Sequence, residues 1–214
     1  MATAIKKKAA PPVREFKQKR AAATYEALLD AAEDVFATRG FDGAQSAEIA
    51  AAAGVSTGAF YRYFADKRQC FLEMIARELQ RAHEDVLRRL DPAKFREGDE
   101  RKMIEAALRV LFDHSRNNPA LGRVYQALSL TDPDVARIRA DYESRALDSL
   151  TIIIQQLVPR SSIADPRAAA LVIQLAAVEI GAHQGDLRPR ISTVTDAAAL
   201  RALVDMLHRY LFPA

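Results

Sequence analysis

The chain has 214 residues, half of them hydrophobic, so it is long enough for a folded core and too apolar to be disordered throughout. A single cysteine excludes an internal disulfide, which fits a reducing cytoplasm, and no run is apolar enough for a membrane span or signal peptide. The net charge is +3, but residues 1–20 alone carry net +6, so the remainder is acidic. We therefore expect a cytoplasmic protein with a basic flexible arm at 1–20 that reaches an anionic partner.

Apolar residues recur at helical spacing along the rest of the chain, and no segment alternates as a β-strand does. Segments rich in Pro, Gly and charge separate these stretches. The pattern predicts an all-α fold with about nine helices, at 24–39, 45–53, 57–64, 67–90, 101–117, 120–130, 133–158, 166–184 and 196–212. The first three would form a small domain at 21–66, and the other six a larger domain at 67–214.

The most informative stretch is IAAAAGVSTGAFYRYFADK, from Ile49 to Lys67. Gly54 interrupts a short helix and can take the positive φ that a tight turn needs. Ser56 can cap the following helix, and Phe60 and Phe64, one turn apart, can both face inward. The second helix then presents hydroxyl groups, tyrosines and an arginine outward. This pattern predicts a helix-turn-helix whose second helix enters a major groove of DNA.

With its flanking residues, this stretch resembles the TetR family of bacterial transcription regulators. The shared features are a first helix ending in RGF, the segment EIA, GVSTGAFYRYF, and D-K before a long helix, all within about Thr24 to Ile75. The resemblance implies a DNA-binding domain followed by a helical domain that binds a small-molecule effector. It also implies a homodimer, paired through its two C-terminal helices, that represses from a palindromic operator and is released by the effector.

The resemblance and the helix positions together give candidate DNA contacts. Thr57 and Gly58 would approach base edges, and Arg62 would bind a guanine. The full set is Gln45, Ser46, Ser56, Thr57, Gly58, Tyr61, Arg62, Tyr63 and Lys67. Gln45 or Ser46 would have to supply the phosphate contact before EIA, where the sequence departs from the family pattern. The alternatives are that the tyrosines are partly core, that Arg62 pairs with Asp66, and that Lys67 is only a solvated residue.

The predicted DNA-binding region is itself poor in positive charge. Residues 21–81 contain six Lys and Arg against nine Asp and Glu. Because nonspecific affinity scales with the number of phosphates neutralised, we expect the arm at 1–20 to supply much of it, from the minor groove.

The larger domain carries the expected effector pocket, apolar with a few polar anchors. Its candidate lining residues are Phe112, Ser115, Tyr125, Gln126, Leu128, Tyr142, Gln174, Glu179 and His183. Composition favours a largely apolar effector. Glu179 and His183 lie one turn apart, but two ligands do not make a metal site, so an intrahelical pair or a place at the dimer interface is the better interpretation. The segment 168–182 is apolar on more than one face, which is typical of a dimer helix.

We expect no catalytic residues, cofactor or metal, because no nucleophile–base pair, phosphate loop or metal-ligand spacing appears. Cys70 lies in a helix with no motif around it, so a buried structural thiol is the better interpretation. The remaining alternatives are an activator with the same motif and an architectural DNA-binding protein without an effector.

Overall fold

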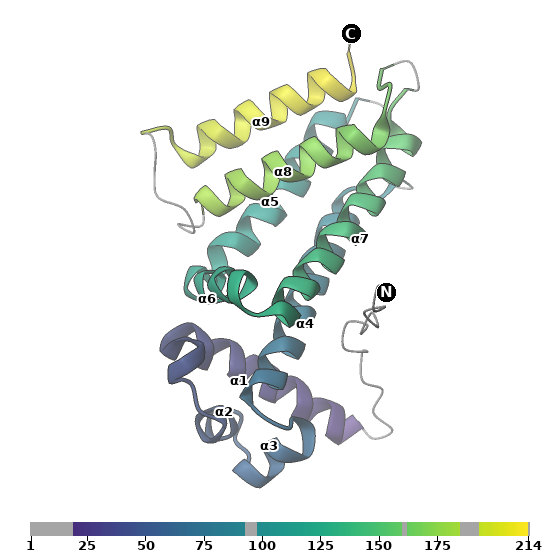
Figure 1. The fold of residues 1–214 in the computed structure, drawn as a ribbon. Helices are drawn as coiled ribbons and strands as arrows, with labels where there is room; N and C mark the ends of the chain where they lie inside the picture. Colours follow the sequence, from purple (N-terminus) through teal and green to yellow (C-terminus); the bar gives the residue numbers. More distant parts are fainter. Residues whose placement is uncertain (1–18, 93–97, 160–161, 185–192, 214) are drawn as a thin grey trace, which may run out of the picture. The chain divides into compact units, whose positions relative to one another are not determined.

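The computed structural model describes residues 19–92, 98–159, 162–184 and 193–213 (Figure 1). That part of the chain is all-α, as predicted, and contains α1 (Lys19–Gly43), α2 (Ser46–Ala52), α3 (Thr57–Tyr63), α4 (Lys67–Arg89), α5 (Glu100–Asn117), α6 (Pro119–Thr131), α7 (Pro133–Leu157), α8 (Pro166–Gln184) and α9 (Asp196–Leu211). The predicted arm at 1–20 lies outside the described residues, except that Lys19 and Arg20 begin α1. None of the described helices has both the length and the apolar character needed to cross a membrane.

The helices form two compact units. The first contains the chain up to Glu78 together with Val124–Asp141, and the second contains Leu79–Arg123 and the chain from Tyr142 onward. The division therefore passes through α4, α6 and α7, so each of these three continuous helices contributes residues to both units.

An aromatic core holds the first unit together. Phe36 of α1, Phe60 of α3 and Phe71 of α4 are almost fully buried, and so is Phe64 directly after α3. The Phe36 and Phe71 rings meet edge to face with centroids 5.0 Å apart. The inward positions predicted for Phe60 and Phe64 are confirmed. This core fixes α3 against α1 and α4, so the opposite side of α3 is left for solvent.

The turn between α2 and α3 is specified locally. Gly54 has φ of +69°, a conformation that glycine adopts without the strain a Cβ would bring. Ser56 caps α3, its Oγ accepting from the backbone N–H of Ala59 at 3.2 Å. The helix–turn–helix predicted from 49–67 is therefore present, with both of its local devices in place.

In the second unit, α5 packs against α8 and α9, and α8 also contacts α9 (Figure 1). Gly181 allows the close approach of α8 to α5, because a Cβ there would lie only 3.0 Å from the Phe112 ring. The buried core includes Leu108, Ile173 and Val204, one from each of these three helices.

Candidate functional site

The outward face of α3 carries the polar groups expected of a recognition helix. Ser56, Thr57, Gly58 and Arg62 are exposed, as is Tyr61, whose side chain is 55% exposed. Their hydrogen-bonding groups therefore face solvent from a rigid, capped helix. This arrangement can present donors and acceptors to the edges of bases.

Tyr63 belongs partly to the core and partly to the surface. Its ring centroid lies 6.3 Å from that of Tyr25, which in turn stacks on Phe64 at 5.5 Å. The Tyr25 hydroxyl donates to the Glu73 carboxylate at 2.6 Å, so α4 holds this aromatic group in place. Tyr63 itself is half-buried, which orients its ring more firmly than that of Tyr61.

The start of α2 lies at the surface as well. Gln45 is its exposed N-cap residue, and Ser46 is half-buried. The backbone N–H of Gln45 donates to the Glu48 carboxylate at 3.1 Å, and Glu48 also pairs with Arg39 at 3.5 Å. Both predicted residues are thus at the first turn of α2, with an acidic side chain beside them.

Lys67 is engaged within the unit. Its Nζ donates to the backbone carbonyls of Phe41, Asp42 and Ala44, each at 2.9 Å, and lies 5.2 Å from the centroid of the Phe41 ring. An ammonium group has three donors, so these carbonyls occupy all of them. Lys67 therefore ties the α1–α2 connection to the first turn of α4. Sequence reasoning missed this contact because backbone carbonyls leave no residue-type signal.

Most other cations of this unit are also engaged. Arg77 contacts the carboxylates of Glu26, Asp30 and Glu78 at 2.8–3.0 Å. Arg62, in contrast, has no ion-pair partner among the described residues, and Asp66 instead accepts from the backbone N–H of Gln69 at 2.7 Å. The Arg62 guanidinium is therefore available for an anionic or base-edge partner.

A second charged contact links α4 to the α6–α7 corner inside the first unit. Arg68 donates to both oxygens of Asp132, at 3.0 and 2.8 Å, and to Asp134 at 2.8 Å. Burial acts to raise the pKa of Asp132, but hydrogen bonds from the Val135 and Asp134 backbone and from Arg68 outweigh it and leave that pKa lowered. The hydrogen bond from Arg68 also lowers the pKa of Asp134. Both carboxylates therefore stay ionised, and the contact persists at neutral pH.

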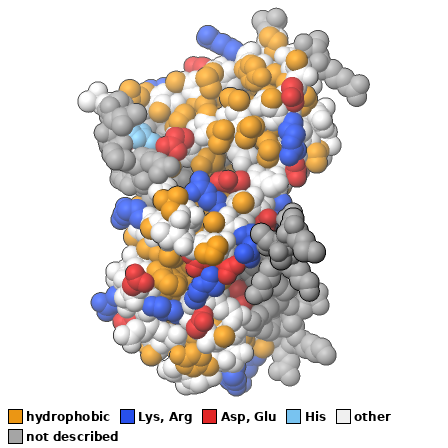
Figure 2. All heavy atoms as spheres, in the orientation of Figure 1, with side chains coloured by type: hydrophobic (Ala, Val, Ile, Leu, Met, Phe, Trp, Pro, Cys, Tyr) orange, Lys and Arg blue, Asp and Glu red, His pale blue; other side chains and the backbone are white. Residues whose placement is uncertain are grey.

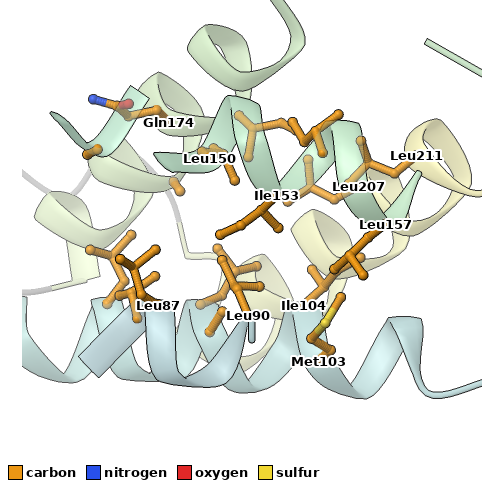
Figure 3. A pocket seen from close by; sticks show the side chains of 18 of the residues that line it. Leu87, Leu90, Met103, Ile104, Leu150, Ile153, Leu157, Gln174, Leu207 and Leu211 are labelled. Atoms are coloured by element: carbon orange, nitrogen blue, oxygen red, sulfur yellow. The ribbon is translucent and has the colours of Figure 1, made fainter. Parts of the chain in front are cut away.

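An apolar pocket of about 150 Å³ lies within the second unit (Figure 3). Hydrocarbon side chains from α4, α5, α7, α8 and α9 form most of its wall, among them Leu87, Ile104, Leu150, Ile153, Leu157, Leu207 and Leu211. Two predicted lining residues, Tyr142 and Gln174, are brought together here. The contribution of α4 was missed, although its second half carries Val86 and Leu87 on one apolar side, with Leu90 directly after the helix.

The other seven predicted pocket residues do not line this pocket. Phe112 is buried in the core, and the Ser115 hydroxyl donates to the Leu111 carbonyl at 3.4 Å. Glu179 is exposed on α8, and His183 is half-buried. The remaining three lie on the part of α6 that belongs to the first unit: Tyr125, Gln126 and Leu128.

Among the described residues, three polar side chains line the pocket, and none of the three is a Lys, Arg, Asp or Glu. Burial lowers the pKa of His83, and Arg145 lowers it further. Burial raises the pKa of Tyr142, so its phenol stays protonated. The third is Gln174, an amide. The part of the wall that the structure describes is therefore uncharged at neutral pH, and it suits the hydrocarbon part of a ligand.

The second unit also exposes apolar side chains on α8 and α9. Hydrophobic side chains spread over the face where these helices lie (Figure 2). The exposed hydrophobic side chains on these two helices include Leu171, Val172, Leu175 and Val178 of α8 and Met206 and Tyr210 of α9. An apolar group of this kind on paired helices is typical of a protein–protein interface.

The capped α2–turn–α3 unit places the chain in the class of helix-turn-helix DNA-binding proteins. The chain belongs to the TetR family. Residues 28–74 match the family model described as bacterial regulatory proteins, tetR family, and residues 101–211 match the one described as Tetracyclin repressor-like, C-terminal domain.

Two curated relatives and one solved structure extend this result. The chain is similar to the HTH-type transcriptional repressor DrrR1 of Streptomyces coeruleorubidus, at 26% identity over 88% of this chain and 64% of that protein. It is also similar to the HTH-type transcriptional activator FasR of Mycolicibacterium smegmatis, at 28% identity over 72% and 67%. The chain thus spans about two thirds of the length of these relatives. A solved TetR-family structure from Mesorhizobium loti shares the fold, with a TM-score of 0.75 and 22% identity over 91% of this chain and 98% of that one.

Proposed function

We propose that this protein is a dimeric transcription repressor whose hold on a palindromic operator is released by a small, largely apolar effector. One observation carries the proposal: α4 and α7 are linked within the unit that contains α3, and both also line the apolar pocket. The link is made by Arg68 of α4, which contacts Asp134 of α7 and Asp132 directly before it. In domain terms, α1–α3 would read DNA, and the six helices from α4 onward would bind the effector and the second subunit.

Reading of the operator would fall to the exposed face of α3. Thr57 and Gly58, at its first turn, would approach base edges most closely, and Arg62 would donate to a guanine. Tyr61 and Tyr63 would contact phosphates or sugars. Gln45, Ser46 and Ser56 lie at the first turns of α2 and α3 and would contact the phosphate backbone. Lys67 would contribute by fixing the α1–α2 connection rather than by binding a phosphate, since its donors are occupied.

Dimerisation would use the exposed apolar side chains of α8 and α9. A single helix-turn-helix contacts too few base pairs for a unique site, whereas two copies read two half-sites about one helical turn apart. Leu175 and Val172, which are 61% and 62% exposed, would lose contact with water on pairing. Glu179 lies on the same helix and would lie near this interface.

Release would follow from differential affinity. An effector shifts the dimer only to the extent that it binds the released state more tightly than the DNA-bound state. Because α4 and α7 both line the pocket, a change in their spacing there would reach the Arg68 contact along continuous helices. An activator remains the alternative, because one relative is named as an activator and one as a repressor.

Catalysis has no part in this proposal. Cys70 is buried, and burial raises the pKa of its thiol, so the thiol stays protonated and shielded. The described residues also contain no group of three or more His, Cys, Asp or Glu side chains placed to hold a metal ion.

Selection of DNA from a random-sequence pool at physiological salt tests the proposal. The full chain should enrich a palindrome. Leu175→Glu, which places a charge in the proposed interface, should be monomeric by sedimentation and should lose that enrichment. Leu130→Glu is the matched control, because Leu130 is 86% exposed on α6 and lies outside the α8–α9 face. Enrichment without two-fold symmetry, or a monomer that still selects the palindrome, would refute a dimeric operator-binding protein.

A further inference from the structure

At Met103 the apolar pocket adjoins a second pocket of different chemistry. Met103 lies at one end of the apolar pocket, and Gln174 lies at the other (Figure 3). Met103 also lines a more open pocket of about 430 Å³, which residues from the end of α4 and the first half of α5 form within the second unit. The two pockets therefore come within the width of one residue of each other. Because a methionine side chain has three rotatable bonds, it can adapt to a ligand that extends from one pocket into the other.

The second pocket is charged, in contrast to the described wall of the first. Its lining residues include three cations and two carboxylates: Arg88, Arg89, Lys102, Asp91 and Asp99. The side chains of all three cations are exposed. An anionic group bound there would therefore gain positively charged neighbours while keeping part of its hydration, so the cost of desolvation stays small.

Among these cations, Arg89 is the one whose charge no carboxylate balances. The Arg88 guanidinium contacts the Asp85 carboxylate, and Lys102 Nζ lies 3.1 Å from Asp99 Oδ1. Arg89, in the last turn of α4, forms no ion pair or hydrogen bond with the residues that the structure describes. A guanidinium can donate two parallel hydrogen bonds to a carboxylate or phosphate. Arg89 is therefore the side chain best suited to bind an anionic group next to Met103.

We infer that the effector is an amphipathic anion, with its hydrocarbon part in the apolar pocket and its anionic group bound by Arg89 in the adjoining pocket. This inference rests on the proposed function and names its ligand class. The apolar pocket, at about 150 Å³, has the volume of a cavity known to hold benzene, so the enclosed hydrocarbon part is of about that size. Burial of this part supplies most of the affinity, and Arg89 determines the preference for an anion.

Calorimetric titration of the full chain at low salt, with three probes of equal chain length, tests this. The probes are octanoate, its uncharged analogue octanamide, and the octylammonium cation. Their chains are slightly longer than benzene, so that the head group can extend past Met103. We expect octanoate to bind about fivefold more tightly than octanamide, the upper range for an exposed ion pair, and octylammonium to bind most weakly. Because the head group would lie in an open pocket, the preference for octanoate should decrease at high salt.

Three variants separate the two parts of the site. Arg89→Gln should bind octanoate and octanamide alike, with the octanamide affinity retained as evidence of an intact apolar pocket. Arg123→Gln is the matched control and should keep the fivefold preference, because Arg123 is exposed in the same unit and lines neither pocket. Ala146→Phe, which fills the apolar pocket, should weaken the binding of octanoate and octanamide.

Four results would each overturn the inference: octanamide or octylammonium binding as tightly as octanoate, a full preference for octanoate in Arg89→Gln, undiminished octanoate binding by Ala146→Phe, or no binding of any probe. None of these results affects selection of a palindromic operator, so the proposed regulator would stand. Loss of operator selection would refute the proposed function and leave the probe preference unchanged.

Discussion

At the scale of single residues, Lys67 shows how a motif position acts by holding the backbone. Its ammonium donates to two carbonyls at the end of α1 and to that of Ala44, in the connection between α1 and α2. Hydrogen bonds from a charged donor contribute more to stability than neutral ones do. Removal of the lysine would leave three backbone carbonyls without this donor. The position of α2, and with it that of the turn and α3, therefore depends on this side chain.

We predict that Lys67→Met lowers the free energy of unfolding by about 1–3 kcal/mol and weakens operator binding, while the slope of log affinity against log salt stays unchanged. Arg62→Gln is the matched comparison. It should leave stability unchanged and weaken operator binding, because Arg62 has an exposed side chain in the recognition helix. Denaturant titration and binding at several salt concentrations measure both. A flatter salt slope with normal stability in Lys67→Met would instead mean a phosphate contact.

His83 gives a prediction on pH. Because its folded pKa lies below the unfolded value of 6.5, the unfolded chain binds the proton more readily. The contribution of His83 to stability is therefore constant well above pH 6.5 and falls as the pH drops below 6.5 toward the folded pKa. Glu84 opposes this shift without cancelling it. The thermal midpoint, measured from pH 8 to pH 5, should decline less in His83→Gln than in the parent. Identical declines would contradict this assignment.

Among the helices, α4 and α7 are the ones that, under the proposed function, would connect DNA binding to effector binding. Arg68 is 40% exposed and Asp132 18% exposed, so the pair adds only about 0.2–1 kcal/mol to stability. The Arg68 contact matters because it links α4 to the start of α7, the two helices that also line the pocket.

We predict that Arg68→Met keeps the operator affinity of the ligand-free protein within a few-fold but shrinks the change caused by effector. Coupling between sites amounts to about 1–3 kcal/mol in typical allosteric proteins, so a loss is measurable by anisotropy with labelled operator. Arg109→Met is the control, since the described partner of Arg109 is Glu105, one turn away on α5. An undiminished response in Arg68→Met would show that the signal travels elsewhere.

Features set by neighbouring residues could be predicted from the sequence, and features set by several distant helices could not. Gly54 and Ser56 act on their own neighbours, so the helix-turn-helix and its capped recognition helix were predictable from residue order alone. Which face of a helix borders a cavity depends on several distant helices. Of the predicted residues, Tyr142 and Gln174 line the pocket, whereas Phe112 packs in the core beside Gly181. The partners of Lys67 are backbone atoms, which no residue pattern marks.

For the whole molecule, charge is distributed unevenly. Arg39, Arg68 and Arg77 are held in ion pairs within the first unit, which leaves few described cations for phosphates. We predict that deletion of residues 1–20, which carry net +6, weakens operator binding and flattens its salt dependence. Binding isotherms between low and physiological salt measure this slope. The arm would have no role in binding if the slope were the same in both proteins.

The proposed function requires that occupancy of the apolar pocket controls DNA binding. This is measured directly by the anisotropy of labelled operator with the parent and with Ala146→Phe, which fills the pocket, each titrated with the tightest pocket ligand found by calorimetry. We expect at least about fivefold weaker operator binding by the parent when ligand saturates, and no dependence on ligand in Ala146→Phe. If the operator affinity of the parent does not change at saturating ligand, or if the filled variant responds equally, the pocket does not control DNA binding.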